Sequence, residues 1–385
     1  MVEWKTIKDI CISICSGGTP STSHKEYYNG SIPWLRTQEV DWTDVYDTEI
    51  KITEKAIANS TAKLIPSNCV IVAMYGATAA KVAINKIPLA TNQACCNLEI
   101  NASKADYKFV YQWLCKEYHN LKSLGEGSQH NINGKKVKEY PIPIPPLSEQ
   151  NRIVGILDTF TESIENLKKQ ITERKKQYEH YRDQLLDLEG KPEKDVKQFG
   201  EICEMIKGNG VQKTDFVDEG IGCIHYGQIY THYGSFTYTT NKFVSKEVFD
   251  KAKKASKGDI VMTDTSENVE DICKSVAYLG EEDIAVSNHA LIIKHRQNPK
   301  FLSYTTYTKS FFNQKRKYAY GVKVTGIKPD HLARFLIYLP SIEEQNHIVT
   351  ILDTFEASIA NLEAQLSLRQ KQYEYYRNML LTFDE

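Results

Sequence analysis

Two long stretches of the chain repeat apolar residues at alternating intervals of three and four positions. In 149–186 these residues are Leu157, Phe160, Ile164, Leu167, Ile171, Tyr178, Tyr181 and Leu185. In 344–381 they are Leu352, Phe355, Ile359, Leu362, Leu366, Tyr373, Tyr376 and Leu380. This spacing, sustained over about four heptads, predicts a helix that packs along a second helix as a coiled coil. Arg174 and Arg369 occupy the one position of each seam that is not apolar.

The two stretches are copies of one another. They align without a gap at an offset of 195 residues, and 24 of the 38 aligned positions are identical. Such a repeat makes the chain a tandem of two similar halves. Pro146 precedes the first helix, and Ser341 with Glu344 forms a capping box before the second. Gln150 and Gln345 lie just inside the helix starts, and we expect them to cap the helices, the alternative being a contact with a partner protein.

A globular segment precedes each helix. Short β-rich runs lie between turn signals at 68–76, 81–85, 96–101, 258–264, 275–280 and 289–295, and helical patterns lie at 106–121 and 300–315. This mixture predicts an α+β fold for each segment. We expect two globular α+β domains separated by two long helices that form an antiparallel coiled coil. The expected bounds are 1–147 for the first domain, 148–190 for the central helix, 191–340 for the second domain and 341–385 for the last helix.

The two globular segments share a few landmarks. A strand-like stretch ending in Gln38 corresponds to one ending in Gln228, and Thr91–Gln93 corresponds to Ser287–His289. The remaining sequence of the two segments is only faintly alike. We therefore expect one fold that presents two different surfaces.

Composition narrows the class of protein. The chain has 385 residues, of which 41% are hydrophobic and 25% charged, so it should bury real cores in two to four domains. Neither a membrane span nor a signal peptide is indicated, and a cytoplasmic protein is expected. Nine cysteines without a Cys-x-x-Cys pair predict neither a disulfide framework nor a structural metal site.

The charge is unevenly distributed. The net charge of −1 divides into +2 for 1–147, +4 for 191–340, −2 for 148–190 and −5 for 341–385. The globular segments are thus mildly basic and the helices acidic. Two basic clusters are candidates for neutralising phosphates, namely Lys135, Lys136 and Lys138 in the first segment, and Lys315, Arg316 and Lys317 in the second. A solvated protein surface is the more common explanation of such a cluster.

Signatures of self-sufficient enzymes are missing from the sequence. It contains no P-loop, no H-E-x-x-H, no G-x-S-x-G and no amino-methyltransferase tetrapeptide. A hydrolase with a Cys–His pair is one alternative, which thiol alkylation would test. A coiled-coil scaffold whose globular ends bind proteins or glycans is another. No enzyme activity is expected of the chain itself.

The two helix starts share a motif, IPIPPLSEQNRI at 142–153 and IYLPSIEEQNHI at 337–348. Further motifs of the same kind are Ser16–Pro20, Tyr28–Trp34 and Thr91–Gln93. Together with the duplication, they resemble the specificity (S) subunit of Type I restriction-modification systems, the HsdS family. The resemblance extends over essentially the whole chain.

The resemblance implies two target recognition domains that each read one half of a bipartite DNA sequence. It also implies that the helices form a spacer and dock two modification (M) subunits. These subunits carry S-adenosylmethionine and methylate adenine at N6, whereas restriction (R) subunits use ATP and Mg to translocate and cleave DNA. No cofactor is therefore expected in this chain. Because the two surfaces differ, the target should be an asymmetric, interrupted double-stranded sequence.

Base edges are read by Arg, Lys, Asn and Gln, and phosphates are held by Lys, Ser, Thr and backbone amides. In the first domain the candidates for DNA contact are Ser16, Thr19, Arg36, Thr37, Gln38, Tyr75, Thr78, Lys81, Asn92, Gln93, Ser128, Gln129, His130 and Asn131. In the second they are Asn209, His225, Tyr226, Gln228, Thr265, Ser266, Asn288, His289, Lys323 and Thr325. If the chain binds DNA, its affinity for the duplex should fall steeply as the salt concentration rises. The scaffold alternative predicts no duplex binding and partners whose binding is insensitive to salt.

Overall fold

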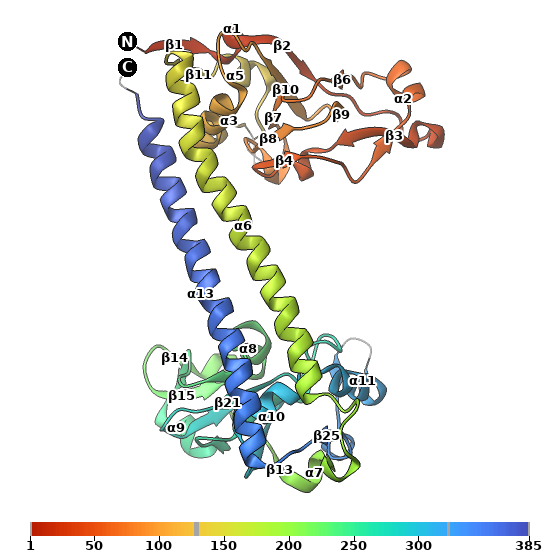
Figure 1. Cartoon of the computed structure of the whole chain (residues 1–385), viewed down its shortest axis with the longest axis vertical. Helices are drawn as coiled ribbons and strands as arrows, with labels where there is room; N and C mark the ends of the chain where they lie inside the picture. Colours follow the sequence, from red (N-terminus) through yellow and green to blue (C-terminus); the bar gives the residue numbers. More distant parts are fainter. Residues whose placement is uncertain (1, 127–130, 322–323, 384–385) are drawn as a thin grey trace. The chain divides into compact units, whose positions relative to one another are not determined.

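The computed structural model describes residues 2–126, 131–321 and 324–383. The chain forms two compact units: unit 1 comprises Met1–Lys168 with Ala364–Glu385, and unit 2 comprises Lys169–Glu363. Two long helices, α6 (Leu147–Leu186) and α13 (Ile342–Leu380), each contribute one half to each unit (Figure 1). The division into four segments stays a prediction, because compactness groups each globular domain with the helix halves beside it.

Unit 1 is built on two sheets and a two-stranded ribbon. The five-stranded sheet has the order β2 (Cys11–Ser16), β10 (Cys95–Ile100), β7 (Val70–Ala73), β8 (Val82–Asn85) and β4 (Thr43–Val45). The four-stranded sheet has the order β5 (Lys51–Ile52), β3 (Tyr28–Leu35), β9 (Leu89–Thr91) and β6 (Leu64–Ile65), and the ribbon pairs β1 (Glu3–Thr6) with β11 (Pro141–Ile144). The α-helices of the domain are α1 (Ile7–Ile10), α2 (Glu54–Ala58), α3 (Tyr107–Lys116), α4 (Tyr118–Ser123) and α5 (Gly134–Lys138).

Unit 2 repeats this plan. Its first sheet has the order β13 (Cys203–Lys207), β23 (Ala290–His295), β19 (Ile260–Thr263), β21 (Ser275–Tyr278) and β16 (Phe236–Thr237). The second has the order β14 (Phe216–Val217), β17 (Lys242–Val244), β15 (Ile221–Ile224), β22 (Ile284–Val286) and β18 (Lys254–Ala255), and the ribbons pair β12 (Val196–Gln198) with β25 (Leu336–Tyr338) and β20 (Thr265–Ser266) with β24 (Thr325–Gly326). The domain's α-helices are α7 (Phe199–Ile202), α8 (Tyr226–Thr231), α9 (Lys246–Lys251), α10 (Pro299–Thr305), α11 (Lys309–Tyr318) and α12 (Pro329–Leu332).

The two domains have one fold, as the sequence predicts. In each domain, two strands of the second sheet pair in parallel: β3 with β9, and β15 with β22. The outer pairs β4 with β8 and β16 with β21 are also parallel. In both domains, one residue with a positive φ begins the return to the sheet, Ala80 at 70° and Cys273 at 59°.

The backbone register corrects the pairing of landmarks. The Leu35 carbonyl accepts from the Asn92 amide at 2.9 Å, and the Ile224 carbonyl accepts from the Ser287 amide at 3.1 Å. Asn92 is therefore the counterpart of Ser287, one position away from the pairing expected from residue identity. The same bonds make Arg36 the counterpart of His225, so that Gln228 corresponds to Glu39 and the pairing with Gln38 was wrong.

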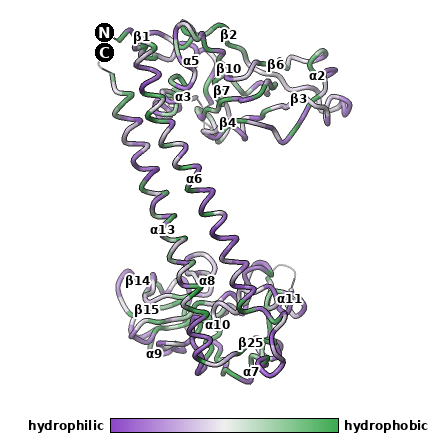
Figure 2. The backbone as a smooth tube through the Cα atoms, viewed as in Figure 1, coloured by the Kyte–Doolittle hydropathy of each residue, from purple (hydrophilic) through white to green (hydrophobic). Residues whose placement is uncertain are grey.

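Each domain packs a capped helix against its first sheet and against one long helix. The Asp106 carboxylate accepts from the backbone of Lys108 (2.8 Å) and Phe109 (3.0 Å) at the start of α3. Asn298 does the same at the start of α10, which is the arrangement of an N-cap. The apolar faces of α3 and α10 then join the strand residues in the two main cores, where hydrophobic stretches of backbone gather in Figure 2.

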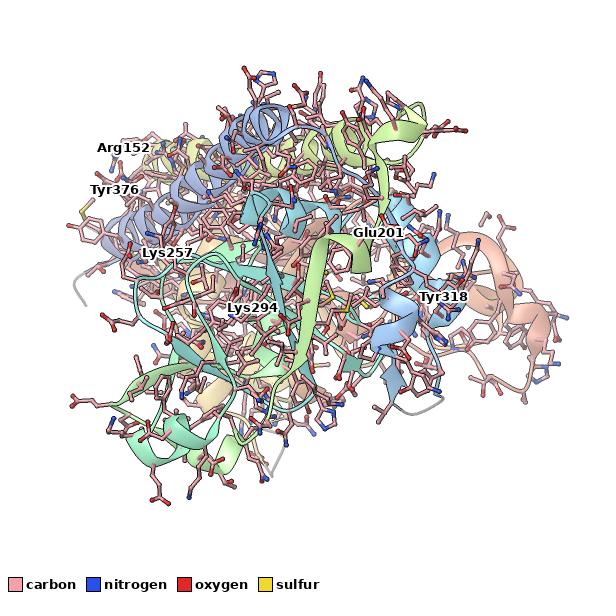
Figure 3. The ribbon with its side chains drawn as sticks, turned by 90° about the horizontal axis from the view of Figure 1, so that it is seen from below. Arg152, Glu201, Lys257, Lys294, Tyr318 and Tyr376 are labelled. Atoms are coloured by element: carbon pink, nitrogen blue, oxygen red, sulfur yellow. The ribbon has the colours of Figure 1, made fainter. Side chains whose placement is uncertain are left out.

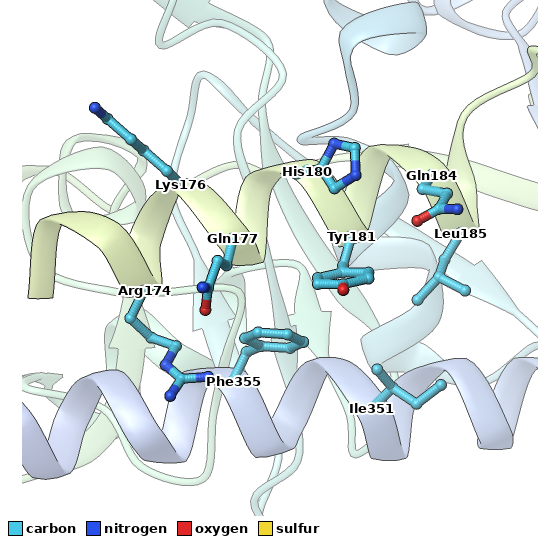
Figure 4. A pocket seen from close by; sticks show the side chains of 9 residues that line it. All are labelled: Arg174, Lys176, Gln177, His180, Tyr181, Gln184, Leu185, Ile351 and Phe355. Atoms are coloured by element: carbon cyan, nitrogen blue, oxygen red, sulfur yellow. The ribbon is translucent and has the colours of Figure 1, made fainter. Parts of the chain in front are cut away.

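In unit 2, the halves of α6 and α13 pack side by side in opposite directions. Tyr181 stacks on Phe355 with ring centroids 5.3 Å apart, and one turn and a half earlier in α6 the Lys175 ammonium pairs with Glu363 at 2.7 Å. Residue numbers thus rise along one helix while they fall along the other. Arg174 covers the Phe355 ring at 5.8 Å, and Figure 4 shows Arg174, Tyr181 and Phe355 between the two helices.

Unit 1 makes the same contact with the roles of the helices exchanged. Phe160 of α6 stacks on Tyr376 of α13 at 5.2 Å, and Arg369 covers the Phe160 ring at 5.7 Å. These three residues are the repeat counterparts of Phe355, Tyr181 and Arg174. The antiparallel coiled coil expected from the sequence is confirmed within each unit.

The seam residues differ in burial. Those that are buried are Leu157, Ile164, Leu167, Ile171 and Leu352, and most of the others are partly buried. The stacked rings of Tyr181 and Tyr376 remain 43% and 38% exposed. The coiled coil therefore carries aromatic surface at the same position in both units.

Candidate nucleic-acid interface

In unit 1, glycines bring the end of β2 close to the turn between β9 and β10. A Cβ on Gly17 would lie 2.1 Å from the Thr91 carbonyl oxygen, so only glycine fits there without a backbone shift. The Gly18 amide donates to the same carbonyl at 2.8 Å. This approach places the Thr19 hydroxyl against the Gln93 amide, with which it forms a hydrogen bond.

The 3₁₀ turns at Thr37–Glu39 and Gly76–Thr78 lie beside each other. The Thr78 hydroxyl donates to the Thr37 carbonyl at 2.8 Å, and the Gly76 amide donates to the Asn131 side chain at 3.1 Å. Tyr75, between these contacts, is 44% exposed. Loops that are far apart in the sequence thus gather exposed polar side chains into one surface.

Two further candidates of unit 1 are held by neighbours. The Lys81 ammonium pairs with Asp41 at 2.6 Å and lies 4.3 Å from the centre of the Trp42 ring. The Asn92 side chain accepts from the Ala94 amide at 3.2 Å, which closes the turn before β10. Asn92 therefore shapes the turn, while Gln93 is exposed on it and Ser16 is exposed at the end of β2.

In unit 2, the corresponding surface is aromatic and polar. The Gly210 amide donates to the Asn288 side chain at 2.9 Å, and the Lys253 amide donates to Asn209 at 2.8 Å. The Tyr226 ring lies 5.4 Å from His289, whose Nδ1 is 3.2 Å from the Thr265 hydroxyl. These residues cluster as their counterparts in unit 1 do.

Three candidates of unit 2 are buried. His225 is 5% exposed, and its Nδ1 accepts from the Gly227 amide at 3.2 Å at the start of α8. Burial, helped by Lys213 and His289, lowers the pKa of His225 to about 4, so the ring is neutral at pH 7. Ser266 and Thr325, 3% and 7% exposed, lie opposite each other in the β20–β24 ribbon. Direct DNA contact was predicted for all three; their burial instead suits residues that position neighbours.

Gln228 has a capping role as well. Its side-chain oxygen accepts from the His225 amide at 3.0 Å, and its side-chain nitrogen donates to Asn241. Four further candidates, Ser128, Gln129, His130 and Lys323, lie outside the described residues. Their predicted contacts stay predictions.

The family model for the Type I restriction modification DNA specificity domain matches residues 1–174 and 192–368. The chain belongs to this family. The specificity subunit of the type I restriction enzyme EcoR124I/EcoR124II of Escherichia coli is 38% identical over 204 residues, which is 50% of either chain. The match thus spans about half the length of that subunit. The EcoprrI specificity subunit of Escherichia coli is 26% identical over 379 residues, 92% of this chain and 88% of the relative.

Solved structures show the same fold. A chain from a study of complex assembly and conformational transition of the type I R-M system matches with a TM-score of 0.64, at 17% identity, over 100% of this chain and 98% of the other. The crystal structure of a Type I S subunit from M. genitalium matches with a TM-score of 0.57, also at 17% identity, over 100% and 97% of the two chains.

Sequence reasoning missed charged residues of this specificity-domain surface. Lys207, at the end of β13, is the counterpart of Ser16, and its side chain is 63% exposed while its ammonium pairs with the buried Asp264 at 3.1 Å. In unit 1, Glu39 and Glu49 contact Arg36. The position of Lys207 directly after a strand, like Ser16, was a signal that could have identified it.

One lysine of each predicted basic cluster has an internal partner. Lys136 pairs with Glu126. Lys315 is 4% exposed and donates to the carbonyls of Glu270 and Ile272, both at 2.9 Å, so it is unavailable to a phosphate. Elsewhere on unit 2, Lys294 pairs with Asp259 at 2.7 Å; Lys294 is labelled in Figure 3. The ammonium groups of these three lysines are therefore engaged by neighbouring groups of their own domain.

Gln150 and Gln345 do not cap their own helices, contrary to expectation. Both are fully buried, and each oxygen accepts from the N-cap residue of the neighbouring helix, Asp106 at 2.9 Å and Asn298 at 3.0 Å. Each side-chain nitrogen donates to a proline carbonyl five residues before it, at 2.8 and 2.9 Å. These glutamines fix each long helix to α3 or α10.

Two searches of the described residues bear on other kinds of site. Within residues 2–126, 131–321 and 324–383, no group of three His, Cys, Asp or Glu side chains is placed to hold a metal ion. In the same part of the chain, no helix is long and apolar enough to cross a bilayer.

Proposed function

We infer that the chain is the DNA-reading subunit of a Type I restriction-modification complex and that each domain binds one half of an asymmetric, bipartite duplex target. The observation that carries this inference is the placement of two different polar surfaces on equivalent loops of one fold. The Asn92–Leu35 and Ser287–Ile224 backbone bonds are alike, whereas the side chains that project beside them differ. Equal scaffolds orient two readers alike, and unequal side chains select unequal half-sites.

The proposed contacts are the exposed and half-buried candidates other than Asn92 and Gln228. In unit 1 they are Ser16, Thr19, Arg36, Thr37, Gln38, Tyr75, Thr78, Lys81, Gln93 and Asn131, and in unit 2 they are Asn209, Tyr226, Thr265, Asn288 and His289. Amide and guanidinium groups in these sets suit base edges, and the hydroxyl groups and Lys81 suit phosphates. Asn92, His225, Gln228, Ser266 and Thr325 are proposed to position them.

Catalysis is assigned to partners. We propose that two M subunits, with S-adenosylmethionine, methylate adenine at N6, and that R subunits, with ATP and Mg, cleave DNA in the cytoplasm. The equal aromatic contacts around Phe160 and Phe355 support two equivalent docking sites on the helices. The alternative Cys–His hydrolase is disfavoured, because burial raises the pKa of thiols such as Cys69 and Cys223 to about 12 and so suppresses the thiolate.

The test uses the full chain, alone and purified with its M subunit. We expect the complex to methylate one bipartite sequence, with DNA affinity that falls by about a thousandfold or more between 50 and 200 mM salt if six or more phosphates are contacted. The chain alone should not transfer methyl groups. Methylation by the chain alone, or binding that is insensitive to salt and sequence, would contradict the function.

A further inference from the structure

The backbone of Arg36 is held in place by hydrogen bonds to the side chain of Glu39. The Arg36 amide donates to Oε2 of Glu39 at 3.0 Å, at the start of the 3₁₀ turn. The other oxygen of that carboxylate accepts from the Glu49 amide, also at 3.0 Å. Glu39 therefore ties the turn that carries Arg36 to a second loop, and the base of the arginine is fixed from two sides.

The guanidinium itself is oriented by its neighbours. Nη2 pairs with the Glu49 carboxylate. With its amide oxygen toward the arginine, the exposed Gln38 accepts from Nη1 at 3.2 Å and from Nη2 at 2.8 Å. Nη1 and Nη2 of the planar guanidinium thus donate to one acceptor, the side-chain oxygen of Gln38, which lies at the surface.

This arrangement suits a neutral base edge better than a phosphate. Guanine offers O6 and N7 side by side in the major groove, and an arginine fork donates to both. Glu39 and Glu49 add two negative charges beside the one positive charge of Arg36. Such a surplus of negative charge repels a phosphate but leaves hydrogen bonding to a neutral base intact.

Unit 2 has no such fork at the equivalent place. His225, the counterpart of Arg36, donates its backbone amide to Gln228 at 3.0 Å as Arg36 does to Glu39, but its side chain is buried. The turn is thus common to the two domains, whereas the guanidinium held by Gln38 and Glu49 is found at this position in unit 1 and not at its counterpart in unit 2. A group that varies on a constant turn is placed to determine specificity.

We propose that Arg36 reads a guanine in the half-site bound by unit 1, and that Gln38 occupies the arginine fork until DNA displaces it. Once displaced, the exposed Gln38 amide is free to contact the neighbouring base. The proposal rests on the proposed DNA-reading function and adds the base identity and the residue that selects it.

The test begins with the methylation pattern that the complex of chain and M subunit leaves on genomic DNA, which gives the target. Each guanine of the target duplex is then replaced singly by 7-deazaguanine, which lacks the N7 acceptor, or by hypoxanthine, which keeps N7 and O6. We expect 7-deazaguanine at one position to weaken binding of the wild-type complex by about tenfold, because one of two hydrogen bonds to the base is lost. Hypoxanthine at that position keeps both acceptors and should change the affinity little.

Variants connect that guanine to the residue. Arg36→Ala should bind the natural duplex about 10- to 100-fold more weakly and lose its sensitivity to 7-deazaguanine at that position. Arg36→Lys should behave like Arg36→Ala, because an ammonium cannot form the planar fork. Arg296→Ala, an exposed arginine just beyond the end of β23 at His295, is the matched control and should retain wild-type binding.

Several results would overturn the proposal. They are a target in which no 7-deazaguanine weakens the wild-type complex, an Arg36→Ala complex that keeps the full 7-deazaguanine effect, and an Arg36→Lys complex that binds normally, as a phosphate contact allows. If Arg36→Ala fails to fold, the duplex substitutions on the wild type still decide. Failure of the wild-type complex to select any duplex would instead refute the proposed function itself.

Discussion

The loops proposed to contact DNA are anchored by equivalent backbone bonds in the two units and differ in length and in side chains. Ala73 and Thr263 each donate an amide to the carbonyl of a lysine, Lys81 at 2.9 Å and Lys274 at 2.9 Å. Between these fixed points unit 1 has the short segment 75–80, and unit 2 has the longer segment 265–273. Insertions are tolerated there because the bonds that bracket the segment hold the sheet without it.

The longer segment changes the chemistry as well as the shape. It contributes Glu267, Glu270 and Asp271, where the shorter one has only small and polar residues after Tyr75. The buried ammonium of Lys315 supports it through two carbonyls. In unit 2 the longer segment is thus held from within the domain by a buried charged side chain.

The largest effect is expected where the two units are most alike. Leu157 and Leu352 are repeat counterparts, both fully buried in the main core of their unit. Leu157→Ala should destabilise unit 1, and Leu352→Ala unit 2, each by about 2–5 kcal/mol from lost burial and a residual cavity. Hydrogen exchange measured by peptide mass spectrometry reports the two units separately.

Leu368→Ala is the control, because that side chain on α13 is 58% exposed and should cost little. A cost confined to one of the two leucines, or equal loss of protection in both units from a single substitution, would break the comparison. The first result would mean that the cores are packed unequally. The second would mean that the units unfold as one.

The next effect is expected where the units differ. Burial lowers the pKa of Lys315 to about 8, with opposing contributions from Cys273, Asp271 and Glu270 and a reinforcing one from Lys274. The lysine of the unfolded chain keeps its proton up to about pH 10.4, so unfolding takes up a proton between these values. The contribution of Lys315 to stability should therefore increase with pH from about 8 to 10.4, by an amount on the order of 3 kcal/mol.

Urea unfolding at pH 7 to 11 checks this, by comparison of the wild type with Lys315→Met. All four tryptophans, Trp4, Trp34, Trp42 and Trp113, lie in unit 1, so fluorescence follows that unit while circular dichroism follows both. The pH-dependent difference between the two proteins should appear in dichroism alone. A difference in fluorescence, or one of the opposite sign, would refute the assignment to unit 2.

Much of the fold follows from the sequence because its signals are local. The seam of α6 and α13 is visible as a period, and strands such as β7 and β19 are short apolar runs between turns. The landmarks failed by one position because Gln38 and Gln228 were matched by residue type. The structure matches Gln228 with Glu39, since either side-chain oxygen can accept the amide hydrogen at the start of the turn.

The candidate surface was less predictable because exposure depends on contacts between distant residues. His225 was chosen as a polar residue beside a turn, yet the ring packs against Phe216 at 5.8 Å and is buried. The bracing of Arg36 by Glu49 joins loops that lie on either side of the short strand β4, 13 residues apart in the sequence. Neither contact leaves a signal that can be read from local sequence.

The smallest of the effects tests whether the two helix corners are equivalent. Gln150→Met and Gln345→Met each remove a buried side chain that satisfies one backbone amide and one proline carbonyl. An unpaired buried backbone group costs about 1–3 kcal/mol, so each variant should lose about that much stability in its own unit. Gln345 also donates to Gln297 at 2.9 Å, a contact for which Gln150 shows no counterpart among the described residues, so Gln345→Met should cost slightly more.

The measurement is hydrogen exchange of the Asp106 and Asn298 amides, with the exposed Gln177→Met as control. Equal exchange in variant and wild type would show that these bonds do not hold the domains to the helices, and the corners would then have to be fixed by the ion pairs of Lys108 with Asp158 and Lys300 with Asp353, at 2.6 and 2.8 Å.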